Sequence, residues 1–207
     1  HFSIVKLLAE NGGRRPKLIF CEKPLAETVV DAKYLVVACR VNNVSFAVNH
    51  SRRWDPLWRQ VKKLVDDGEI GGLKLFTGVY TGSPMNVGVH MADLVNWFNP
   101  EDHHIHQLKY ARLHDFLVFE VDMWGERGRV VVQNNGFHYR VEKPGFSIRY
   151  RDICELSLSY DRYDVFGEGT SMLDAYRNII SHLKSGEPLA CEGEDGVKAV
   201  ETVEGWI

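Results

Sequence analysis

Residues 17–25, Lys-Leu-Ile-Phe-Cys-Glu-Lys-Pro-Leu, decide the fold, because a short apolar run ends here in charged residues and a proline. A helical pattern over Glu27–Asn42 follows, and a second apolar run, Val44–Val48, comes after it. Strand, helix and strand in this order predict a β-α-β unit with parallel strands. Neither strand alternates strictly between apolar and polar residues, as expected where helices cover both faces of a parallel sheet.

The residues before this unit predict a further helix, Ser3–Glu10, with Ile4, Leu7 and Leu8 on one face and a stop at Asn-Gly-Gly, residues 11–13. Two parallel strands with so few helices would leave apolar strand edges in water. The final predicted helix also runs to the end of the sequence without capping residues. We therefore expect the natural polypeptide to extend beyond both ends of this sequence.

The pattern changes after Asp55-Pro56, which can cap and begin a helix. Between Ile105 and Tyr150, apolar or period-2 runs alternate with turn residues, which favours an antiparallel sheet with hairpin turns at 126–128 and 134–136. The expected elements are a helix, a strand, a second helix, this group of strands and two closing helices: 55–68, 73–80, 89–98, 105–150, 172–185 and 194–206. We predict a partial α/β domain followed by an α+β domain.

Composition and charge exclude several classes of protein. Apolar residues make up 44% and charged residues 26% of the 207, which suits a globular chain with a sizeable core. Lys and Arg number 25 against 28 Asp and Glu, so no positive field exists to bind nucleic acid. No apolar run reaches the roughly 18 residues of a membrane span. Four cysteines without a C-x-x-C pair predict reduced, buried thiols in a cytoplasmic protein: Cys21, Cys39, Cys154 and Cys191.

Lys23 stands at the carboxyl end of the first predicted strand, where open α/β sheets bind their ligands. Beside a cationic nicotinamide ring, like charge and partial desolvation would lower the pKa of its ammonium group and suit it to proton transfer. The alternative is a surface lysine at a strand-to-helix turn. The spacing alone leaves both readings open.

His90 and Asp93 lie three residues apart, on one helical face if the helix begins near Val89. A carboxylate partner would fix the tautomer of the histidine and stabilise its cation, which suits acid and base work near neutral pH. The alternative is a histidine at a helix N-terminus, followed by an Asp that the helix dipole favours. Neither motif decides the function by itself.

Other chemistries find little support in the sequence. Several histidines fall in or near an expected loop without the i, i+4 spacing or the cysteine partners of a zinc site, so we predict no metal: His103, His104, His106 and His114. G-x-G-x-x-G, P-loop and Gly-x-Ser-x-Gly motifs do not occur. Phosphoryl transfer and serine hydrolysis are therefore not expected.

Four short motifs in a fixed order resemble the glucose-fructose oxidoreductase and inositol dehydrogenase (Gfo/Idh/MocA) family along essentially the whole chain. They are Lys17–Ala26 (KLIFCEKPLA), Val48–Pro56 (VNHSRRWDP), Gly68–Gly71 (GEIG), and Tyr80 with Asn86–Asp93 (NVGVHMAD). The resemblance implies the C-terminal part of a Rossmann-type parallel sheet in residues 1–52. It further implies, in residues 53–207, an α+β domain for substrate binding and oligomerisation with a large, mostly antiparallel open sheet.

The resemblance also implies an activity and a site. The activity is NAD(P)-dependent hydride transfer between nicotinamide and a carbinol carbon of a sugar, cyclitol or related polyol. Lys23 and His90 take the catalytic positions. Many members have Asp where this chain has Asn86, whose amide can orient a hydroxyl but cannot accept its proton. The implied contact residues are Glu22, Lys23, Pro24 and Asn49 for the cofactor, and Arg53, Tyr80, Asn86 and Asp93 for the substrate.

The expected partners follow from the same resemblance. The family's Gly-rich pyrophosphate turn precedes the part present here, so the sequence does not choose between NAD and NADP. A small sugar or polyol substrate is expected, together with homodimer or homotetramer contacts through the open sheet, and without nucleic acid or membrane. The alternative function is a cofactor-deficient fragment or pseudoenzyme that acts as a carbohydrate-binding or assembly module.

Overall fold

The computed structural model describes the chain except for residues 14, 99–104, 112–115, 164–169 and 207. The chain divides into two compact units. The first comprises His1–Asp55, Ser83–Asn96 and Gly169–Ile207, and the second comprises Pro56–Gly82 and Trp97–Glu168. The units are defined by packing within this chain, and the division into domains 1–52 and 53–207 stays a prediction.

The first unit contains the predicted β-α-β arrangement. Its two strands pair in parallel, in a register that runs from Leu18 opposite Ser45 to Glu22 opposite Asn49. The Thr28 hydroxyl caps the intervening helix by accepting a hydrogen bond from the Asp31 amide at 3.1 Å. The elements of this unit are α1 (Phe2–Glu10), β1 (Leu18–Glu22), α2 (Val29–Val41), β2 (Ser45–Asn49), α4 (Val89–Phe98), α5 (Thr170–Ser185) and α6 (Gly193–Glu204).

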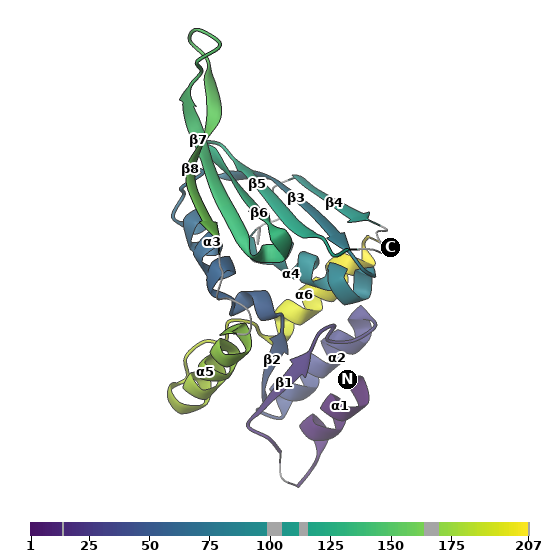
Figure 1. Cartoon of the computed structure of the whole chain (residues 1–207). Helices are drawn as coiled ribbons and strands as arrows, with labels where there is room; N and C mark the ends of the chain where they lie inside the picture. The colour runs from purple at the N-terminus through teal and green to yellow at the C-terminus, as the bar shows by residue number, and fades with distance from the viewer. Residues whose placement is uncertain (14, 99–104, 112–115, 164–169, 207) are drawn as a thin grey trace. The chain divides into compact units, whose positions relative to one another are not determined.

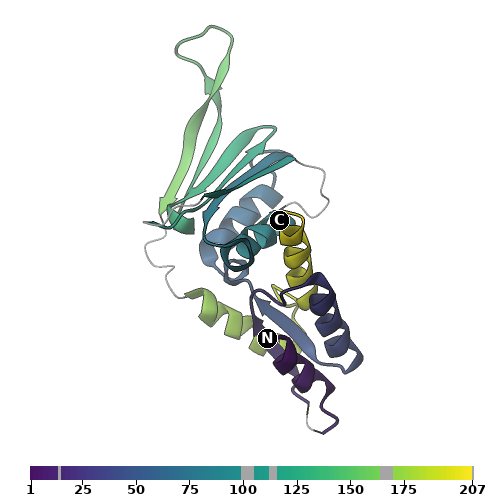
Figure 2. The ribbon, with the colours of Figure 1, turned by 90° about the vertical axis from the view of Figure 1, so that its right-hand side faces the viewer.

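Helices cover both faces of the two-stranded sheet, which explains why its strands do not alternate in polarity. Ile19 and Cys21 join the core that α1 and α2 line. Leu18 points the other way and packs with Ile179 of α5 and with Leu189. Figures 1 and 2 show α5 on one side of the strands and α1 with α2 on the other. The sheet is therefore the middle layer of three.

The second unit is dominated by a six-stranded sheet in the order β4-β3-β5-β6-β7-β8. β3 and β4 are parallel, and every other neighbouring pair is antiparallel. A parallel two-stranded sheet followed by this sheet confirms the expected fold class. The elements of the unit are α3 (Pro56–Asp66), β3 (Leu73–Thr81), β4 (Ile105–Ala111), β5 (Phe119–Gly125), β6 (Gly128–Gln133), β7 (His138–Phe146) and β8 (Cys154–Tyr163).

Both predicted hairpin turns are present. Two residues, 126 and 127, join β5 to β6, and the Asn-Asn-Gly turn joins β6 to β7. Asn134, Asn135 and Gly136 all have positive φ, of 52°, 58° and 93°, a conformation that Asn and Gly tolerate best. Gly136 also lies against the indole of Trp58 in α3, where a Cβ would come within 2.8 Å of Nε1.

Two expectations from the sequence differ from the structure. The first helix forms, but it buries Val5 and Ala9 and leaves Ile4 and Leu7 each 67% exposed, because the sheet lies against the other face of the helix. Burial of Cys21, Cys39 and Cys191 agrees with the expectation, whereas the thiol of Cys154 is exposed.

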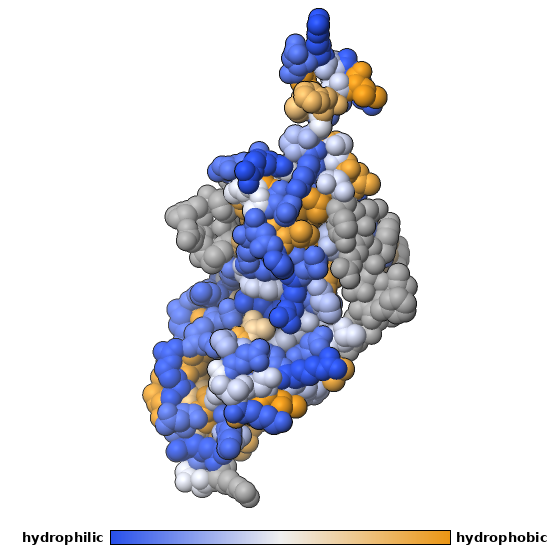
Figure 3. All heavy atoms as spheres, turned by 90° about the vertical axis from the view of Figure 1, so that its left-hand side faces the viewer, coloured by the Kyte–Doolittle hydropathy of each residue, from blue (hydrophilic) through white to orange (hydrophobic). Residues whose placement is uncertain are grey.

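The last strand of the sheet, β8, is absent from the sequence-based prediction. Residues 154–160, Cys-Glu-Leu-Ser-Leu-Ser-Tyr, alternate with a period of two, so the pattern of a strand was present. β7 and β8 continue past the other strands as a hairpin (Figure 1). Apolar side chains lie on its projecting end (Figure 3), among them Phe146 and Ile148, which are 91% and 98% exposed.

Among the helices of the described residues, none combines the length and the apolar composition that a membrane span requires.

The close approach of Ile70 to the start of the β5–β6 turn yields a test of the second unit. A Cβ on Gly125 would lie 2.3 Å from the Ile70 carbonyl oxygen, and a backbone atom cannot move aside cheaply. We predict that Gly125→Ala lowers the free energy of unfolding by about 1–3 kcal/mol, as overpacking does elsewhere. The matched control is Gly72→Ala, where the added carbon meets ordinary contacts of 3.4 Å or more. Equal urea midpoints for the two variants would contradict this packing.

Candidate functional site

Lys23 meets Asn86 at the carboxyl end of β1. The Lys23 ammonium donates two hydrogen bonds to Asn86, one to its backbone oxygen and one to its side-chain Oδ1, both at 2.7 Å. Asn86 lies in a π-helical turn, Pro84–Gly88, which leads directly into α4. Two segments 63 residues apart in sequence are thus joined at the edge of the sheet where parallel α/β proteins bind ligands.

His90 occupies the first turn of α4, a few residues after Asn86. Its Nδ1 is buried without a hydrogen-bond partner among the described residues, and its ring packs edge-to-face against His50, with centroids 5.6 Å apart and an interplanar angle of 88°. Burial lowers the pKa of His90 well below the usual value, and the charges of Arg52, His50 and Lys23 lower it further. The lowered pKa favours the neutral form of the His90 imidazole.

The pKa of Lys23 is also lowered. Desolvation by partial burial is the largest cause, the positive charge of Arg52 adds to it, and the carboxylate of Glu22 opposes it. A lysine with a lowered pKa exchanges protons more readily near neutral pH than a free one. Lys23 and His90 are thus two titratable groups, and the charge of Lys23 lowers the pKa of His90.

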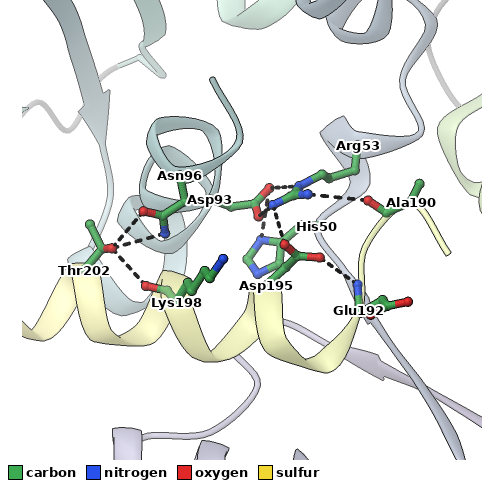
Figure 4. Close-up of polar contacts among 9 residues, drawn as sticks. All are labelled: His50, Arg53, Asp93, Asn96, Ala190, Glu192, Asp195, Lys198 and Thr202. Atoms are coloured by element: carbon green, nitrogen blue, oxygen red, sulfur yellow. Dashed lines mark hydrogen bonds and ion pairs between the residues drawn. The ribbon is translucent and has the colours of Figure 1, made fainter. Parts of the chain in front are cut away.

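A buried ion pair fixes α4 in place (Figure 4). Arg53, which ends the short turn after β2, donates to both carboxylate oxygens of Asp93 in α4, at 2.8 and 3.1 Å. Its Nη2 also bonds Asp195 of α6 at 3.1 Å. Arg53 and Asp93 are only 7% and 1% exposed, so neither charge is solvated and each depends on its partner.

α4 and α6 are joined at a second point. The Asn96 amide donates to the Thr202 hydroxyl at 3.1 Å, and apolar side chains from both helices pack together. Asp195 also accepts a hydrogen bond from the Glu192 amide at 2.8 Å, which completes a capping box at the start of α6. The orientation of α4, and hence of His90, is over-determined by these contacts.

Asn49 and Glu22 form a polar pair at the ends of β2 and β1. The Asn49 amide nitrogen donates to Glu22 Oε1 at 2.8 Å, while its Oδ1 is buried without a hydrogen-bond partner in the described part of the chain. A buried acceptor without a donor is costly, so this oxygen suits a bound group that donates a hydrogen bond. Pro24 lines a hollow of about 610 Å³ on the same unit, together with His1, Phe2, Glu27 and other residues.

The structure brings most of the predicted site residues together in the first unit. Glu22, Lys23, Asn49, Asn86 and His90 gather around the carboxyl ends of the two strands through the contacts above. Tyr80 belongs to β3 of the second unit, where it is buried. His103, His104 and His114 lie outside the described residues, and His106 lies in β4. No group of three or more metal-ligating side chains occurs within the described ranges.

The expected pairing of His90 with Asp93 is wrong. The Asp93 carboxylate binds Arg53 and lies 4.0 Å from Nδ1 of His50, because the buried guanidinium requires a counter-charge. His50 and Asp195 were not predicted as part of this arrangement. His50 directly follows β2 as Lys23 follows β1, so the rule that selects Lys23 also selects His50.

The chain resembles known proteins in sequence and in structure. No family model matches the chain. The chain is 28% identical over 114 residues to D-apiose dehydrogenase of Paraburkholderia graminis, 29% over 108 residues to inositol 2-dehydrogenase of Salmonella typhimurium, and 30% over 127 residues to 2,7-anhydro-N-acetylneuraminate hydratase of Mediterraneibacter gnavus. These matches cover 47%, 46% and 58% of this chain and 29%, 32% and 32% of the relatives, so the chain matches about a third of their length.

Solved structures share the fold over nearly the whole chain. Levoglucosan dehydrogenase in complex with NADH and levoglucosan superposes with a TM-score of 0.81 at 17% identity, covering 99% of this chain and 73% of that one. A myo-inositol dehydrogenase from Sinorhizobium meliloti, described as putative, gives a TM-score of 0.74 at 17% identity over 99% of this chain and 73% of that one. The chain is therefore similar in sequence to named dehydrogenases of inositol and D-apiose, and it shares the fold of levoglucosan dehydrogenase. The resemblance seen in its four motifs is confirmed.

The buried ion pair of Arg53 makes a quantitative prediction. Arg53→Met leaves the Asp93 and Asp195 carboxylates without their cation, so we expect a loss of about 3–5 kcal/mol in the free energy of unfolding. The control is Arg40→Met, which removes an exposed ion pair with Glu194 and should cost about 1 kcal/mol or less. Urea unfolding curves measure both. Equal losses in the two variants would show that the buried pair does not brace α4.

Proposed function

We propose that the protein containing this chain is an NAD(P)-dependent oxidoreductase that transfers a hydride between nicotinamide and a carbinol carbon of a sugar, cyclitol or related polyol. The observation that carries the proposal is the meeting of Lys23, Asn86 and His90 at the carboxyl ends of β1 and β2. The names of the relatives support it, since they include dehydrogenases of inositol and D-apiose. The second reading, a non-catalytic module, gains no support from these names.

The residues at the strand ends fit a nicotinamide cofactor. The unpartnered Oδ1 of Asn49 can accept a hydrogen bond from a carboxamide or ribose donor, and Glu22 lies within 2.8 Å of the same side chain. Glu22, Lys23, Pro24 and Asn49 would hold the group, and bound nicotinamide supplies the hydride acceptor or donor. Solved relatives of the same fold have been described with NADH or NAD⁺.

The chain's own residues then handle the hydroxyl proton. When an alcohol is oxidised, its oxygen must lose a proton as the carbon loses a hydride. The neutral imidazole of His90 or the amine form of Lys23 accepts this proton, and the same group returns it in the reverse reaction. Asn86 cannot accept it, because an amide oxygen does not become protonated in this range.

Three further residues were expected to contact the substrate, namely Tyr80, Arg53 and Asp93. Tyr80 stays a proposed substrate contact. Arg53 and Asp93 satisfy each other in the interior, so we assign them to positioning α4 and not to direct contact with hydroxyl groups. Asn86 lies close enough to Lys23 to share a substrate hydroxyl with it.

The location and assembly of the protein also remain proposals. The polar side of the large sheet carries a paired network in which Arg129 binds Asp122 and Glu142 and stacks 4.2 Å over the Trp124 ring. A self-paired polar surface with an aromatic residue suits contact with a second copy. We infer a homodimer or homotetramer through this sheet and a cytoplasmic location.

Replacing Lys23 tests the function directly. In the full-length protein, with NAD⁺ or NADP⁺ and a panel of polyols that includes inositol, Lys23→Met should lower kcat by about 10²–10⁴-fold, because proton transfer is lost. The formation of reduced nicotinamide is followed by its absorbance. Lys33→Met, which removes an exposed partner of Glu201, should keep the wild-type rate.

The fluorescence of NADH is titrated with Lys23→Met, and kcat is measured at saturating cofactor, so that a lower kcat is separated from weaker cofactor binding. An unchanged kcat for Lys23→Met would reject the assigned role. A wild-type protein that binds neither NADH nor NADPH would reject the oxidoreductase itself.

A further inference from the structure

We propose that Asn86 is a positioning residue that fixes the single direction in which Lys23 exchanges its proton. The proposal deepens the oxidoreductase function and rests on it. Asn86 offers two acceptors to one nitrogen, its backbone oxygen and its Oδ1, each 2.7 Å from Nζ of Lys23. A residue that only bound substrate would have no reason to hold the lysine at two points.

The geometry of a tetrahedral nitrogen turns these two contacts into a constraint. A lysine ammonium has three N–H donors, and Asn86 takes two of them. A single N–H direction is then left for a substrate. The lysine side chain is otherwise flexible, and its ammonium group rotates freely. The two hydrogen bonds to Asn86, which we call the clamp, stop this rotation and fix the direction of the third N–H bond.

The same clamp works for both protonation states of the lysine. A neutral amine has two N–H bonds and one lone pair, arranged in the same tetrahedral way. Lys23 can therefore keep both hydrogen bonds to Asn86 after it loses its proton, and its lone pair then occupies the third position. Proton exchange with a hydroxyl at that position needs no rearrangement of the site, which is the condition for efficient acid and base catalysis.

An amide and a carboxylate at this position would act differently on Lys23. A carboxylate beside Lys23 would stabilise the ammonium and raise its pKa, whereas an amide oxygen accepts a hydrogen bond without adding charge. The other charged or titratable groups that face Lys23 are Glu22 on β1, Arg52 after β2 and His90 on α4. Of these, Glu22 favours the charged lysine, and Arg52 opposes it.

The variant Asn86→Asp tests the proposal because it keeps both acceptors and adds one negative charge. We expect the pKa of Lys23 to rise by about one unit. The ammonium then persists to higher pH. In a plot of kcat/KM for alcohol oxidation against pH, the rising limb therefore moves to higher pH by the same amount. Asn86→Ala keeps only the backbone acceptor, so it should lower kcat while moving the limb less than Asn86→Asp does.

A readout independent of activity separates this proposal from the function on which it rests. The pKa of Lys23 is measured by NMR titration of its side-chain carbon in the protein without substrate, with Lys33 as an internal control that should not change. A raised Lys23 pKa in Asn86→Asp supports the clamp even if the chosen polyols are not substrates. An unchanged pKa, or a raised KM with an unmoved limb, would overturn it and return Asn86 to a role in substrate binding.

Discussion

The buried guanidinium of Arg53 is the interaction on which the candidate site depends. It joins the turn after β2 to Asp93 on α4 and to Asp195 on α6, so three segments that are distant in sequence share one charge. Asn86 and His90 lie immediately before and within the first turn of the helix that this charge holds. Without this ion pair, the Asn96–Thr202 hydrogen bond and the apolar packing against α6 would be left to hold α4 in place.

Such a pair is expensive to bury, and its value lies in specificity rather than in stability. Desolvation of two charges offsets most of their attraction, so an apolar replacement of the same volume could be as stable. A charged pair, however, accepts only one arrangement of its helices, because a shifted α4 would leave an unpaired carboxylate in the interior. The fold thus uses an interaction of small net energy to determine where Asn86 and His90 stand.

The sequence predicts the architecture well and the site only in outline. The β-α-β unit follows from two apolar runs around a helical pattern, and the Asn-Asn-Gly turn follows from its need for positive φ. Local patterns could not reveal that Asp93 binds Arg53 in place of His90, since that choice depends on a residue 40 positions away. The clamp of Lys23 by Asn86 is equally non-local, and so is the contact of His50 with His90.

The central claim is that Lys23 and His90 both contact the substrate hydroxyl group whose proton is transferred. The most direct measurement is a crystal structure of the full-length protein with a nicotinamide cofactor and a bound polyol. The account predicts that the oxygen of the reacting carbon lies within hydrogen-bond reach, roughly 2.6–3.2 Å, of Lys23 Nζ, with His90 as its second neighbour. A polyol bound with its reacting carbon against the cofactor, but with that oxygen directed away from both side chains, would contradict the account.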